Sequence, residues 1–204
     1  VLFYDCAGGD GYSKPMHLAR VPVARVLDRS SWEFYAGNGA WSRDVADVAV
    51  IFDGSDQLSV HYSQFLGHYL AVYVQPLSTR VVARVADRPE GPWSDPVLLF
   101  NALPPASGGM DYCGMAHLEF QRDGGRIEYV TYVRDTGTFQ QERRVVEVEF
   151  ARRIEADDRD ADYDPQHGVA LSDATNKNQI CMGTDGRLWR QTAVQFRLPV
   201  PHPA

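Results

Sequence analysis

Lysine is scarce in this chain of 204 residues, where Lys14 and Lys177 are the only lysines among 20 basic side chains. The basic residues are outnumbered by 27 acidic ones, which gives a formal net charge of −7. No stripe of basic residues interleaved with aromatics offsets this charge, so a phosphate backbone would be repelled. We therefore expect no nucleic-acid partner, whereas neutral polar ligands are compatible with this composition.

Long apolar runs are also missing, and none approaches the roughly 20 residues of a membrane-spanning helix. We expect no membrane partner. The three cysteines, Cys6, Cys113 and Cys181, are too few for a disulfide-stapled scaffold and too far apart for a metal knuckle. Because the histidines also lack a metal-ligand spacing, we predict neither a metal nor a cofactor.

Short segments with the residue pattern of β-strands are abundant, and they recur about every ten residues with turn residues between them. Asp53-Gly54 and Asp123-Gly124-Gly125 are two such turns. A helix competes only over 140–157, and there Val146, Val148 and Phe150 alternate with glutamates, which favours a half-buried strand. The chain is predicted to be all-β.

One phrase of the sequence occurs twice. Its two copies are Leu18-Ala19-Arg20-Val21 with Asp28-Arg29 and Trp32, and Val82-Ala83-Arg84-Val85 with Asp87-Arg88 and Trp93. A second phrase, Gly67–Val74, returns at Gly125–Val133. Both repeats are displaced by about 60 residues, and a repeated unit of this length buries its apolar faces by stacking on its copies. Trp32 and Trp93 occupy equivalent places, which predicts a packing role for both.

A repeat of about 60 residues is typical of one four-stranded blade of a β-propeller. We therefore predict a single β-propeller domain over residues 1–204, with about three to four blades in this chain. Closed propellers usually have four to eight blades. We expect that one or more N-terminal blades precede Val1 or are supplied by another chain, and that the atypical segment 151–204 completes or caps the sheet.

The order of nine phrases resembles a five-bladed propeller family, common in actinobacteria and long described as a domain of unknown function, that includes endo-D-arabinanases. The resemblance covers about residues 1 to 150. The phrases are Val1-Leu2-Phe3-Tyr4, Gly8-Gly9, Leu18-Ala19-Arg20-Val21-Pro22, Trp32-Glu33-Phe34-Tyr35, Gly39-Ala40-Trp41, Leu58-Ser59-Val60-His61-Tyr62, Leu66-Gly67-His68-Tyr69, Gly91-Pro92-Trp93-Ser94-Asp95-Pro96 and Tyr112-Cys113-Gly114-Met115-Ala116-His117.

This resemblance implies a secreted, extracellular glycoside hydrolase that acts on a furanose polysaccharide such as D-arabinan, bound in the axial pocket. The chain departs from the family at Gln57, where relatives carry a glutamate, and at Leu118, where relatives carry a proline. Relatives also place acidic residues on a first blade that the matched region does not include. Two alternatives follow, which are a non-catalytic carbohydrate-binding propeller and a structural module of a multi-chain assembly.

Glycoside hydrolysis needs two carboxyl groups that flank the scissile bond. In a propeller the innermost strands line the axial channel, and we assign Gln57–Tyr62 and Tyr112–Glu119 to such strands. Glu119 would share a face with Met115 and His117, and Asp111 precedes the same strand, so these two acids are the catalytic candidates. The alternatives are a Glu119 carboxylate paired with Arg122 or solvent, and an Asp111 that caps a turn.

Six further residues are predicted to bind the sugar. Gln57, Ser59 and His61 alternate along one strand and would form one polar face, although a histidine satisfied within the core is the alternative for His61. For His117 we predict a hydrogen bond to a sugar hydroxyl or to a carboxylate. Tyr112 and Trp41 are the candidates for stacking on sugar rings.

Overall fold

The computed structural model describes residues 1–6, 14–106 and 108–152, together with the backbone of four short strands further along the chain. Within this part the only helical segments are short 3-10 turns, so the fold is all-β as predicted. None of the described helical segments is long and apolar enough to cross a membrane. The strands form three sheets of four or five strands and one separate pair.

Sheet A contains the first five strands of the chain. It has the order β1-β2-β3-β4, and the short β5 also pairs with β2. The strands are β1 (Leu2–Cys6), β2 (Pro15–Arg20), β3 (Glu33–Gly37), β4 (Ala40–Ser42) and β5 (Phe52–Asp53). Three 3-10 turns, η1 (Val23–Arg25), η2 (Arg29–Ser31) and η3 (Val45–Asp47), connect them.

Sheet B is a regular antiparallel meander with the order β6-β7-β8-β9. Its strands are β6 (Leu58–Ser63), β7 (His68–Val74), β8 (Arg80–Ala86) and β9 (Val97–Asn101). Both faces of this sheet are covered. Leu70, Val72 and Val74 of β7 belong to one apolar cluster, and the intervening Ala71 and Tyr73 belong to another, as the period of two along a strand requires.

Sheet C has the order β10-β11-β12-β15-β16. Its strands are β10 (Asp111–Ala116), β11 (Ile127–Gly137), β12 (Gln140–Arg152), β15 (Gln179–Met182) and β16 (Leu188–Arg190), and β13 (Tyr163–Asp164) pairs separately with β14 (Val169–Ala170). All its pairings are antiparallel except that of β12 with β15. The strand predicted over 144–150 is confirmed within β12.

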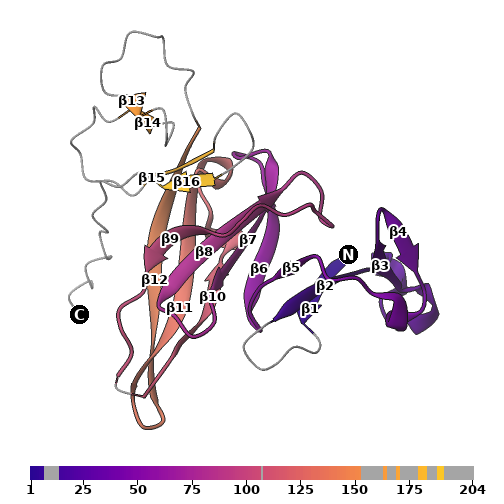
Figure 1. Cartoon of the computed structure of the whole chain (residues 1–204), viewed down its shortest axis with the longest axis horizontal. Helices are drawn as coiled ribbons and strands as arrows, with labels where there is room; N and C mark the ends of the chain where they lie inside the picture. Colours follow the sequence, from indigo (N-terminus) through magenta and orange to yellow (C-terminus); the bar gives the residue numbers. More distant parts are fainter. Residues whose placement is uncertain are drawn as a thin grey trace.

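The three sheets lie side by side in chain order, with sheet B in the middle (Figure 1). The cluster between sheets B and C includes Leu70, Val72, Phe100, Val130 and Phe150. The smaller cluster between sheets A and B includes Met16, Phe52, Ala71, Tyr73 and Val82. Each sheet thus buries its apolar surface against a neighbour, as expected of stacked repeats.

The second repeated phrase falls on the second strand of two neighbouring sheets, whereas the first falls on the second strand of sheet A and the third strand of sheet B. The first lies on β2 and β8, and the second lies on β7 and β11. Trp32 stacks on Phe3 with ring centroids 4.7 Å apart, and Trp93 packs at 5.1 Å from Phe52. Both tryptophans therefore serve packing, in sheet A and between sheets A and B.

The predicted inner strand Tyr112–Glu119 is shorter than expected. β10 ends at Ala116, and the chain then turns through the 3-10 helix η4 (Leu118–Phe120), in which the Phe120 amide donates to the His117 carbonyl at 3.0 Å. A second 3-10 turn, η5 (Asp123–Gly125), leads into β11. Because the chain must reverse between β10 and β11, the alternation of Met115, His117 and Glu119 does not continue a strand.

Candidate functional site

β6 and β10, the first strands of sheets B and C, lie next to each other and run in the same direction. The Ala116 amide donates to the Ser59 hydroxyl at 2.8 Å, and the Cys113 thiol donates to the Gln57 side-chain oxygen. The start of β6 thus lies beside the start of β10. Gln57, Ser59 and His61 each form a hydrogen bond to a residue of sheet C, so this face of β6 connects sheet B with sheet C.

A β-bulge at Cys113 and Gly114 lies where β10 approaches β7. Cys113 has a φ of 54°, in the left-handed region, and the register shifts between Tyr112 and Met115. A Cβ atom at Gly114 would lie 2.7 Å from the Tyr73 carbonyl carbon, so glycine alone fits between β10 and β7.

Asp111 begins β10 and is 8% exposed. Neither of its carboxylate oxygens has a hydrogen-bond partner. Burial raises the pKa of Asp111 to about 6, and Arg134 on the neighbouring strand opposes this shift. A carboxyl group in this state is protonated at mildly acidic pH and is able to donate a proton, as a general acid does.

Three polar side chains, those of Cys6, Lys14 and Asp56, form a cluster just before the start of β6. The Lys14 ammonium lies 3.0 Å from Asp56 Oδ1, and the Cys6 thiol donates to the same oxygen at 3.3 Å. Hydrogen bonds from Lys14 and then from Cys6 lower the pKa of Asp56. Asp56 is therefore held ionised, in contrast to Asp111.

Farther along β6, His61 pairs with Glu128 of β11. His61 Nε2 lies 3.0 Å from Glu128 Oε1, and the side chains are 7% and 0% exposed. His61 Nδ1 and Glu128 Oε2 have no partner among the described residues. This pair lies between sheets B and C, so His61 is a core histidine, as in the alternative, although only its Nε2 atom has a partner.

The surroundings of this pair are polar. Gly125 has a φ of 95°, and a Cβ atom there would lie 2.8 Å from Ser63 Oγ and 2.9 Å from Gln121 Oε1. Both the backbone conformation and the crowding require glycine. Ser63 is fully buried. The B–C contact thus has a polar end beside its apolar core.

His117 and Glu119 form a second histidine–carboxylate pair on the opposite side of sheet C. His117 Nδ1 lies 3.0 Å from Glu119 Oε1, and His117 Nε2 lies 2.8 Å from Thr131 Oγ1. The hydrogen bond with His117 lowers the pKa of Glu119, whose side chain is 61% exposed. His117 thus contacts a carboxylate. Its predicted role in binding a sugar stays a prediction.

The two catalytic candidates are not brought together. Asp111 begins β10 and Glu119 lies beyond its other end. At about 3.3 Å per residue, the five steps from Asp111 to Ala116 alone exceed the roughly 5 to 9.5 Å that separate the carboxyl groups of glycosidases. Their individual roles stay predictions, but they do not form a pair.

The two aromatic candidates are also separate. Tyr112 lies half-buried next to Asp111 on β10, and burial raises its pKa. Trp41 lies on β4, the edge strand of sheet A, with the Arg20 guanidinium 3.9 Å from its ring centroid. Trp41 therefore packs within sheet A and does not join the residues of β6 and β10.

Sequence reasoning missed Glu128 and Asp56. Glu128 alternates with Val130 and Tyr132 on the inward face of β11. The two-residue period of a strand would therefore have been enough to place this charged residue at a core position. Asp56 had no comparable pattern. Among the described residues, no group of three histidine, cysteine, aspartate or glutamate side chains is arranged to hold a metal ion.

Comparison with solved structures finds similarity to a protein from Bacteroides ovatus ATCC 8483 described as a "putative hydrolase". The chains are 16% identical and superpose with a TM-score of 0.49. The similarity covers 68% of this chain and 36% of the other, so the chain spans little more than a third of that protein.

No curated protein matches this chain. One family model matches residues 2–134, which is well over half of the chain. The matched range covers sheets A and B and the first two strands of sheet C, up to Arg134 of β11. The chain belongs to the family described as a domain of unknown function, DUF4185.

Proposed function

We propose that the protein is a glycoside hydrolase of the β-propeller type, in which sheets A, B and C are successive blades. The 60-residue period and the stacking of sheets in chain order support this architecture. β6 and β10 are then the innermost strands of two blades.

The burial of Asp111 is the observation that carries the hydrolase proposal. A carboxyl group with no hydrogen bond and a pKa raised to about 6 has the properties of the acid that protonates a glycosidic oxygen. A second carboxyl group, that of Asp56, lies just before the start of β6, and its pKa is lowered. We propose that the ionised Asp56 is the counterpart of Asp111, which starts the neighbouring strand β10. Opposite pKa shifts of two carboxyl groups are typical of an acid and its base or nucleophile.

The substrate we propose is a furanose polysaccharide such as D-arabinan, and the location is extracellular. Both rest on the resemblance of the nine phrases to the propellers that include endo-D-arabinanases. The formal charge of −7 suits a neutral polymer better than a polyanion.

The test is to incubate the protein with D-arabinan and other furanose polymers and to look for released oligosaccharides. We expect products from the wild type and a loss of at least about a hundredfold in rate for Asp111→Asn, the usual contribution of a general acid. Because the proton of Asp111 is lost above about pH 6, the rate should fall as the pH rises past this value. Asp87→Asn, at an exposed carboxylate of sheet B that pairs with His68, is the matched control.

A non-catalytic carbohydrate-binding module is the second candidate. Gln57 carries an amide where relatives have a glutamate, and its side chain is engaged by Cys113. Binding without products would favour this module. Neither binding nor products would favour a structural module whose blades complete a larger assembly.

A further inference from the structure

The β11–β12 hairpin continues beyond the start of β10. Asp111 pairs with Arg134 of β11, and the hairpin ladder runs on from there to the pair of Gly137 and Gln140. At about 3.3 Å per residue, the steps from Arg134 to Gly137 give a projection of roughly 10 Å beyond Asp111. Figure 1 shows this hairpin extending past the rest of sheet C at the bottom of the view. β7, the strand of sheet B that carries the same repeated phrase, has 7 residues against 11 in β11, so the extension is an addition to the repeated unit.

The base of this hairpin is held against the chain that leads into β10. The Asp135 amide donates to the Met110 carbonyl at 3.1 Å, and the Met110 amide donates to Asp135 Oδ2 at 3.0 Å. The Gln141 side chain forms a hydrogen bond with Tyr112 on β10. The hairpin therefore has a fixed position relative to Asp111, the proposed acid, and to Tyr112, the candidate for stacking on a sugar ring.

The turn of the hairpin carries an aromatic residue at a position that favours glycine. Phe139 has a φ of 57°, in the left-handed region, and is fully exposed. Leu77 has a φ of 56° in the corresponding turn of sheet B and is 67% exposed, so sheet C combines the repeated turn with a longer hairpin and a ring. A fully exposed ring does not stabilise the fold by packing. The strained backbone at Phe139 therefore points to a contact with another molecule.

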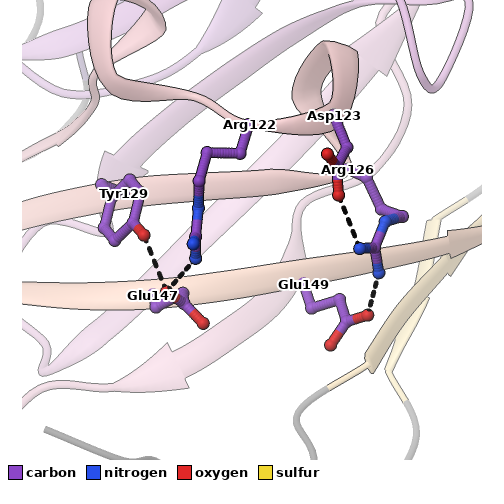
Figure 2. Close-up of polar contacts among 6 residues, drawn as sticks. All are labelled: Arg122, Asp123, Arg126, Tyr129, Glu147 and Glu149. Carbon is purple, nitrogen blue, oxygen red and sulfur yellow. Dashed lines mark hydrogen bonds and ion pairs between the residues drawn. The ribbon is translucent and has the colours of Figure 1, made fainter.

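This turn lies at the end of sheet C and not on either of its faces. Neighbouring blades of a propeller pack on the faces, so the turn stays exposed when they do. β15 pairs with Glu149–Arg152, at the other end of β12. Toward that end polar side chains contact one another, and Figure 2 shows that Arg122 and the Tyr129 hydroxyl both contact Glu147 Oε2, at 2.7 and 2.8 Å. Asp111 and the exposed ring thus share the end of sheet C that lies away from these contacts.

We propose that the β11–β12 hairpin is an arm that holds the polysaccharide substrate beside Asp111, with Phe139 in contact with a sugar ring. The choice of this ligand rests on the proposed function, because Asp111 marks the end at which the polymer is cleaved. A sugar has apolar C–H faces, which an aromatic ring covers, and hydroxyl edges, which need hydrogen bonds. Thr138 and Gln140 flank Phe139, and their exposed side chains supply hydroxyl and amide groups for these edges.

Phe139→Gly separates binding from folding, because glycine removes the ring and adopts the positive φ without strain. We expect the variant to unfold at a temperature no lower than that of the wild type. Electrophoresis of the native protein through gels that contain D-arabinan or plant arabinan measures binding without hydrolysis. The wild type should be retarded, and the apparent affinity of Phe139→Gly should be about tenfold weaker. In hydrolysis of the retarding polymer, the variant should raise KM about tenfold and leave kcat unchanged, since the arm contacts the polymer away from the cleaved bond.

Leu77→Gly is the matched control, because it makes the same backbone change at the corresponding, shorter turn of sheet B and removes no ring. Its retardation should equal that of the wild type. Equal retardation of Phe139→Gly and the wild type, or no retardation of the wild type in either gel, would overturn the arm. A changed oligomeric state of Phe139→Gly with unchanged retardation would assign the ring to contact with a second copy and would also overturn it. Weaker retardation of Phe139→Gly, in a protein that releases no oligosaccharides, would support the arm as a glycan contact and refute the hydrolase.

Discussion

Two histidine–carboxylate pairs of equal length occur on opposite sides of sheet C. His61 and Glu128 lie 3.0 Å apart between sheets B and C, where Glu128 has no exposed surface. His117 and Glu119 also lie 3.0 Å apart, but the Glu119 side chain is 61% exposed. A buried pair whose partner is removed leaves an uncompensated polar group, whereas water replaces the lost partner at the surface. The distance alone therefore says little about the stability that each pair contributes.

Removing the buried carboxylate should have the largest effect. Glu128→Ala leaves His61 without its partner inside the B–C contact, and we expect a loss of about 3 to 5 kcal/mol in the free energy of unfolding. Urea denaturation followed by circular dichroism measures this loss. Glu128→Gln, which keeps the size and one hydrogen bond, should lose much less. A loss no larger for Glu128→Ala than for Glu119→Ala would refute the distinction between the pairs.

Asp111 extends the comparison to a buried carboxyl group without a histidine. Its pKa is about 6 in the folded protein, against about 3.9 in an unfolded chain, so the folded state binds the proton more tightly. Stability should consequently fall as the pH rises from about 4 to about 6, by about 3 kcal/mol in total.

Asn cannot ionise, so Asp111→Asn should remove this pH dependence. We expect the variant to exceed the wild type by up to about 3 kcal/mol at pH 7, and to differ little from it at pH 4. Urea denaturation at both pH values measures the difference. A variant that is shifted equally at the two values would contradict the assignment of the raised pKa to Asp111.

The exposed pair should show the smallest effect. Glu119→Ala removes a surface contact that water replaces, and we expect no change in the urea midpoint beyond the scatter of replicate measurements. His117→Ala removes the contact to Thr131 as well, and because His117 is predicted to bind the sugar, the variant should weaken glycan binding more than it lowers stability. Unfolding of Glu119→Ala at clearly lower urea would show that η4 depends on this contact.

Repetition and alternation in the sequence were enough to predict an all-β chain, the strand within β12 and the packing role of Trp32 and Trp93. These properties depend on residues close together in the sequence or on a pattern that recurs, and both can be recognised without coordinates. The prediction failed where β10 ends, because the polar–apolar alternation continues through His117 while the backbone turns into η4.

The partners of the candidate residues were decided by tertiary structure. Alternation placed Gln57, Ser59 and His61 on one face, but the sequence could not show that this face meets sheet C. His61 and Glu128 are 67 residues apart, and their contact exists only because two sheets stack. By itself the sequence determined the repeating unit and the strand faces, which are local properties, whereas the environment of each polar side chain depends on contacts between units and was decided by their packing.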